Sequence, residues 1–147
     1  MRPIAKSVIP FVPGSYTNGA TASGNIDCKG AEYLELDVMT STSNDATNNP
    51  SVLKLSESDD TVVTNFADIA AFVGDGAGGF TIPAAETATT TPWVVKMRVD
   101  LRGRKRYLKL SVTPITTQII AASGSLHLKE TAPVGTTEAN VAALAEG

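Results

Sequence analysis

The side chains with the clearest potential for chemistry are three acids within four residues, Glu57, Asp59 and Asp60. Carboxylate oxygens at such close spacing are ligands that a hard cation such as Ca²⁺ prefers. Their spacing differs from that of an EF-hand loop, however, and acids are common at turns because Asp and Ser side chains bond the neighbouring backbone. We therefore favour a turn over a metal site, and we expect no cofactor.

The sequence lacks the residue combinations that usually support nucleophilic catalysis or phosphate binding. Cys28 is the single cysteine and His127 the single histidine, so neither an internal disulfide nor a Cys/His metal-ligand set is expected. The glycine-rich residues 74–79 lack the Gly-Lys-Ser/Thr ending of a phosphate loop. We expect a protein that is not an enzyme, with no catalytic, cofactor-binding or metal-binding residues.

Charge is distributed unevenly along the chain, whose formal net charge is −3. Residues 96–109 carry seven of the twelve Lys and Arg residues against one acid, Asp100, whereas residues 27–75 carry ten acids against two lysines. This pattern predicts an acidic flank and a basic flank. Two such flanks are either solvated faces or surfaces that dock onto a charged partner or a second copy. The basic stretch has one aromatic residue, Tyr107, for base stacking, so no nucleic-acid partner is expected.

The basic residues lie on the most regular pattern in the chain, residues 93–113. Apolar and polar residues alternate along 93–101 and again along 108–112, which is typical of half-buried strands. Gly103 lies between them, where a tight turn needs a positive φ. We predict a β-hairpin with a basic tip at residues 102–106.

Short apolar runs separated by Thr, Ser, Asn and Gly fill the rest of the chain, which favours strands over helices. We expect further strands at 32–40, 51–56, 80–83, 115–122 and 125–129, and a turn of helix at 67–73. Gly124 would mark a turn or a bulge. The fold predicted is all-β, a single antiparallel β-sandwich or jelly-roll-like domain.

Both ends differ in composition from the centre, which predicts an extended N-terminal arm over 1–14, a β-sandwich over 15–130 and a C-terminal tail over 131–147. Three prolines exclude the arm from a central strand, yet it is too apolar to remain in water. It should lie on its own sheet or on a neighbouring subunit. We expect no signal peptide and no membrane span.

The runs LKLSESDD at 53–60, Ala-Asp-Ile at 67–69 and GRKRYLKL at 103–110 resemble small tailed-bacteriophage head decoration proteins, also called capsid cement proteins. The resemblance covers about residues 15–133. It implies a β-domain bound to the outer surface of the capsid, often as a trimer, with the major capsid protein as partner.

The expected function is therefore that of a structural virion protein, made in the host cytoplasm, that binds and stabilises the assembled phage head. The arm and the basic tip should contact capsid or sister subunits through Ile4, Val8, Ile9, Phe11, Arg102, Arg104, Lys105 and Arg106. An alternative is a β-sandwich module that binds a host carbohydrate or receptor, with residues 41–50 and 74–79 as candidate loops.

Overall fold

The computed structural model describes residues 5–41, 50–82 and 92–128. Almost all regular structure in these ranges is extended, apart from one 3-10 turn, η1 (Val63–Asn65). The strands are β1 (Ala5–Val8), β2 (Gly14–Tyr16), β3 (Ala22–Asp27), β4 (Ala31–Thr40), β5 (Val52–Ser58), β6 (Ala67–Val73), β7 (Trp93–Asp100), β8 (Tyr107–Thr113) and β9 (Gln118–Leu128).

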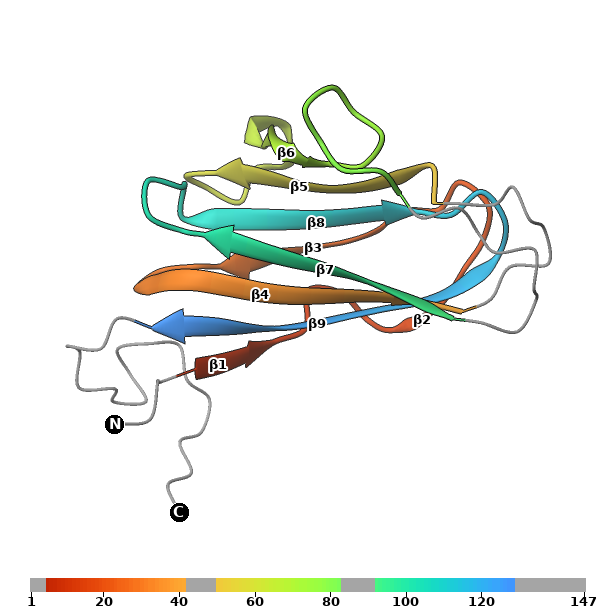
Figure 1. Ribbon diagram of the computed structural model, residues 1–147, viewed down its shortest axis with the longest axis horizontal. Coiled ribbons are helices and arrows are strands. Elements are labelled where there is room, and N and C mark those ends of the chain that lie inside the picture. Colours follow the sequence, from red (N-terminus) through yellow and green to blue (C-terminus); the bar gives the residue numbers. More distant parts are fainter. Residues whose placement is uncertain (1–4, 42–49, 83–91, 129–147) are drawn as a thin grey trace, which may run out of the picture.

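The strands form two antiparallel sheets that face each other (Figure 1). The first has the order β1-β9-β4-β7, with β2 also paired to β9, and the second has the order β3-β8-β5-β6. The predicted all-β sandwich is therefore confirmed. Each sheet turns one face inward, since alternate residues of a strand point to opposite faces.

The core contains the residues that the alternating pattern predicts. Leu34, Leu36 and Val38 of β4 are buried, whereas Glu35 and Asp37 face outward. The same holds for the inward residues of the other long strands. The largest fully buried side chains are Leu34, Leu36, Leu53, Leu55, Leu108, Leu110, Ile120, Leu126, Val38, Val99, Val112 and Pro50.

The predicted hairpin at 93–113 is wrong, although both of its strands exist. β7 pairs with β4 in the first sheet, whereas β8 pairs with β3 and β5 in the second. The connection does contain a tight turn, with Gly103 at φ 82° and the Arg104 amide bonded to the Leu101 carbonyl. That turn carries the chain from one sheet to the other. Alternation reveals which face of a strand is buried but not which strand lies beside it.

The predicted helical turn at 67–73 is also wrong, because this segment is β6. It pairs with β5 through Ala67 opposite Glu57 and Asp68 opposite Ser56. Seven residues are too few for a stable helix without packing, whereas the β5 edge supplies hydrogen-bond partners. The expected strand at 80–83 is reduced to one bridge between Phe80 and Gly74, and residue 83 lies outside the described ranges.

β9 is one continuous strand, so Gly124 marks neither a turn nor a bulge. Its pairing with β4 passes through Gly124 opposite Leu36 without a shift in register. A side chain at this position would overlap the backbone carbonyl of Glu35. The glycine therefore permits close approach of two central strands.

Candidate functional site

The N-terminal segment is tied to its own sandwich. β1 pairs antiparallel with β9, from Ala5 opposite His127 to Val8 opposite Gly124, and β2 pairs further along the same strand. Phe11, between the two pairings, is buried in the core and packs edge-on against Tyr16, with ring centroids 6.0 Å apart. Of the two locations predicted for the arm, residues 5–14 thus occupy the chain's own sheet.

A close backbone contact fixes the path of this segment. The carbonyl oxygen of Pro10 lies so near Gly24 of β3 that any Cβ at that position would overlap it. The Tyr16 hydroxyl donates a hydrogen bond of 2.6 Å to the Val12 carbonyl. The segment therefore joins the first sheet to the second across one open side of the sandwich, and it is held on both sides of Phe11.

The predicted apolar contact residues consequently have different environments. Val8 packs against the core and Phe11 belongs to it, so both contact their own chain. Ile9 is 66% exposed, and Val12, which the site prediction omitted, is 78% exposed. Ile4 lies outside the described residues. Ile9 and Val12 thus expose apolar surface on either side of the buried Phe11, which anchors the segment.

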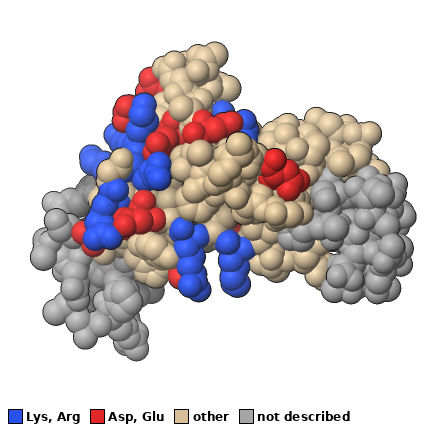
Figure 2. All heavy atoms as spheres, turned by 45° about the horizontal axis from the view of Figure 1, so that its top comes forward, with Lys and Arg blue, Asp and Glu red and all other residues tan. Residues whose placement is uncertain are grey.

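The predicted basic tip is paired within the chain. Arg102 bonds Asp100 at 2.6 Å, Arg104 approaches Glu57 at 3.4 Å, Lys105 contacts Asp59 at 3.2 Å, and Arg106 bonds Asp27 at 2.7 Å. The acids at 57–59 and 27 come from the predicted acidic flank. The prediction of separate flanks is wrong, because the fold brings opposite charges together. Figure 2 shows the resulting mixture of blue and red side chains on one face.

Two of these ion pairs shift the carboxyl pKa values. The hydrogen bonds from the Arg106 guanidinium lower the pKa of Asp27 below its usual range, against a smaller opposing effect of burial. Hydrogen bonds from the Arg102 side chain and backbone amide lower the pKa of Asp100 to about 2. Both acids therefore stay ionised well into acidic solution. Hydrogen bonding to the charged form of the acid is the main cause in each case.

The acids of the turn at 57–60 accept hydrogen bonds from groups within the chain. Asp60 accepts from the Val62 amide at 2.9 Å and from the Asn65 side chain at 2.8 Å, which orders the approach to η1. Glu57 accepts from the Lys105 amide, in addition to its ion pair with Arg104. Within the described ranges, no three His, Cys, Asp or Glu side chains are grouped to hold a metal ion.

The single cysteine and the single histidine lie in different environments. Cys28 is buried, and its burial raises the pKa of the thiol to about 12, so the thiolate nucleophile is scarcely populated at neutral pH. His127 faces outward from β9, as predicted, with its Nε2 atom 3.6 Å from a Glu35 carboxylate oxygen. The Cys28 thiol donates to the Ile26 carbonyl at 3.7 Å while His127 lies beside Glu35, so the histidine is not placed as a base for the thiol by these contacts.

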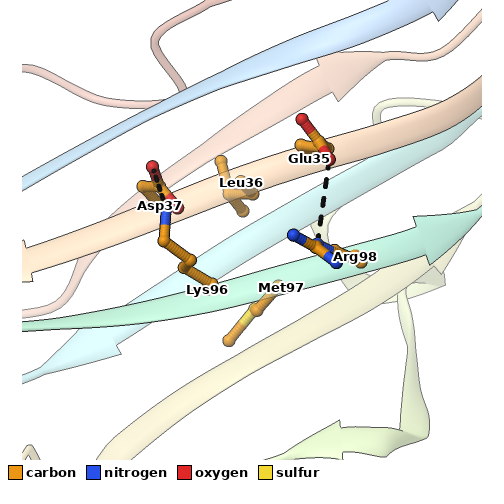
Figure 3. A pocket seen from close by; sticks show the side chains of 6 residues that line it. All are labelled: Glu35, Leu36, Asp37, Lys96, Met97 and Arg98. Carbon is orange, nitrogen blue, oxygen red and sulfur yellow. Dashed lines mark hydrogen bonds and ion pairs between the residues drawn. The ribbon is translucent and has the colours of Figure 1, made fainter.

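A charged ladder on the outer face of β4 and β7 was missed at the sequence level. The register sets Glu35 opposite Arg98 and Asp37 opposite Lys96. Figure 3 shows the two ion pairs, at 3.7 and 3.0 Å, on either side of a small pocket. The signal was present as alternating acids on one strand and alternating bases on another, but the pairing of those strands was not predictable from alternation.

Comparisons with known proteins do not assign the chain to a family. No family model matches the chain, and no curated protein matches it. Among solved structures, the chain is similar in fold to one from "Structure of infectious bursal disease virus Gx strain", with 12% sequence identity and a TM-score of 0.49. The match covers 87% of this chain and 32% of that chain, so the present chain spans about a third of its neighbour. No described helix has the length and apolar character required to cross a membrane.

Proposed function

We propose that this protein is a structural virion component, a decoration or cement protein that binds the outer surface of a phage head and acts without enzymatic activity. The supporting observation is the N-terminal segment, where Ile9 and Val12 are exposed on either side of the buried Phe11. Exposed apolar side chains on a well-anchored backbone can bury area in a partner with little loss of conformational entropy.

The proposed partner is the major capsid protein, and the proposed assembly on the head is a homotrimer. Capsids present the same site many times, so modest contacts at each copy add up through multivalency. The basic tip has a secondary role in this proposal. Two of its ion pairs, Arg102 with Asp100 and Lys105 with Asp59, are exposed at both partners and therefore weak, so exchanging these intramolecular acids for capsid acids costs little and depends on salt.

Two matched substitutions of exposed valines test the proposal. Val12→Asp places a charge in the proposed contact, whereas Val63→Asp changes a valine of similar exposure, 73%, on η1. Heads lacking the protein are incubated with each variant, and occupancy is measured by quantitative mass spectrometry. We expect hundreds of wild-type copies per particle, a loss of at least tenfold for Val12→Asp, and near wild-type occupancy for Val63→Asp.

Two outcomes would overturn the proposal. One is a handful of copies per wild-type particle, which would indicate a vertex, neck or tail component. The other is binding of the free protein to host cells without binding to heads, which would support the host-surface module instead. Heat release of the packaged genome provides a second readout, because a cement protein should raise the temperature at which heads open.

A further inference from the structure

The β7 edge of the first sheet carries a row of backbone groups beside which the described part of the chain places no strand. Within the described part of the chain, β7 pairs with β4 on one side and with no strand on the other. Figure 3 shows β7 running along β4 with Lys96 and Arg98 on it. An uncovered edge strand is a template on which another extended chain can pair.

The register identifies which backbone groups are available. The Leu101 amide donates to the Glu32 carbonyl of the segment beside β7, at 2.9 Å. In an antiparallel pair, the residues that bond the partner alternate with residues whose amide and carbonyl point the other way. Met97 and Val99 therefore bond β4, and the outward groups belong to Val94, Lys96, Arg98 and Asp100.

The side chains along this edge define the chemistry of a complementary strand. Lys96 and Arg98 are 66% and 69% exposed at their side chains, and they project from the outer face of the sheet. On the inner face, Trp93 and Val95 pack against the core but stay partly exposed. An added strand therefore needs acids opposite the two bases and apolar residues on the inward parity.

A second copy of the same edge does not meet this requirement. Antiparallel pairing of two β7 strands would bring the Lys96 and Arg98 side chains of the two copies together, and like charges directly opposite destabilise a sheet. The two bases therefore disfavour self-pairing, a known way in which proteins protect sheet edges. An acidic strand escapes this penalty, because each base would then lie between an acid of β4 and an acid of the added strand.

We propose that β7 is a docking edge for an extended, acidic segment of another protein, which adds to the first sheet as an antiparallel strand. The segment alternates apolar residues with acids, and its acids face Lys96 and Arg98. The proposal goes beyond the proposed capsid function and does not rest on it, since it concerns a different surface from Ile9 and Val12. Its test requires no virus particle.

The probe is a synthetic seven-residue peptide with capped ends, in which two glutamates alternate with valines between terminal threonines. The matched control replaces both glutamates with lysines. We expect the acidic peptide to bind at least tenfold more tightly at low salt. Amide hydrogen exchange, read by NMR on the whole protein, should slow at Lys96 and Arg98 on binding. Exchange at Met97 and Val99, which already bond β4, should not change.

Two variants separate edge pairing from general charge attraction. Val94→Pro removes an outward donor without removing a charge or a bond to β4, and should abolish binding while the fold is retained, as checked by the Met97 and Val99 amides. The double variant Lys96→Glu with Arg98→Glu should reverse the preference between peptides. Equal binding of both peptides to wild type would overturn the proposal. Undiminished binding to Val94→Pro would also overturn it, as would slowed amide exchange that does not alternate along β7.

Discussion

The two edges of the first sheet are protected in different ways. At one, the covered edge, β1 and β2 lie along β9 as edge strands of only four and three residues, and the chain between them passes to the second sheet with Phe11 buried in the core. At the other, the open edge, none of the described strands pairs with the outward backbone groups of β7, which the exposed Lys96 and Arg98 protect. Short, interrupted edge strands offer little backbone for another chain to pair with, whereas a long edge protected by charge stays open to a partner of opposite charge.

The largest effect is expected from removing the anchor of the covered edge. Phe11→Ala deletes a buried aromatic side chain and leaves a gap between the sheets, so we expect a loss of about 3 kcal/mol in the free energy of unfolding. Urea denaturation followed by Trp93 fluorescence measures it. Ile9→Ala, next to the anchor but exposed, is the control and should change stability by less than about 1 kcal/mol. Equal losses in both variants would show that Phe11 does not anchor the segment.

The close contact between Gly24 and Pro10 should be the next most sensitive point. Gly24→Ala forces backbone atoms apart, with an expected loss of roughly 1–3 kcal/mol and faster proteolysis within residues 5–11. Gly14→Ala is the matched control, since its Cβ would meet no atom within 4 Å. If Gly24→Ala retained wild-type stability and protease resistance, the covered edge would not depend on this crossing.

The charges on the open edge should control self-association. The double variant Lys96→Val with Arg98→Val leaves a long apolar edge, and we expect dimers or larger species that increase with concentration in analytical ultracentrifugation. Ser7→Val, on the covered edge, should leave the distribution unchanged. A double variant that sediments like the wild type would show that the two bases do not protect the edge.

The smallest effect concerns the end of the open edge, where Asp100 is bonded by Arg102. Because this carboxyl has a pKa of about 2 instead of 3.8, it stays charged between those pH values in the folded protein. Its depressed pKa means that any stabilisation is present above pH 3.8 and is lost as the pH falls toward 2. Carboxyl ¹³C NMR titration should give a midpoint near 2, and Arg102→Ala should raise it toward 3.8. An unchanged midpoint in that variant would assign the shift to another group.

Residues 93–113 show which structural features follow from a local sequence pattern and which do not. Both strands, their buried faces and the turn at Gly103 were predictable, because alternation and glycine conformation are local properties. The hairpin was not, because the same turn can return a strand to its own sheet or carry it to the facing one. Likewise, the four cations at 102–106 were recognisable as a cluster, but three of their four intramolecular acids are distant in sequence, up to 79 residues away.

The sequence by itself determined that this chain forms a β-sandwich and which residues of its long strands face the core. These properties follow from the two-residue period of a strand and from the burial of apolar side chains. Only the tertiary structure decided which strands are neighbours, which charges neutralise each other and which edge stays open. Those features depend on contacts between segments that are distant in sequence. Such contacts stabilise the fold only when both sheets have formed, so no local pattern reveals them.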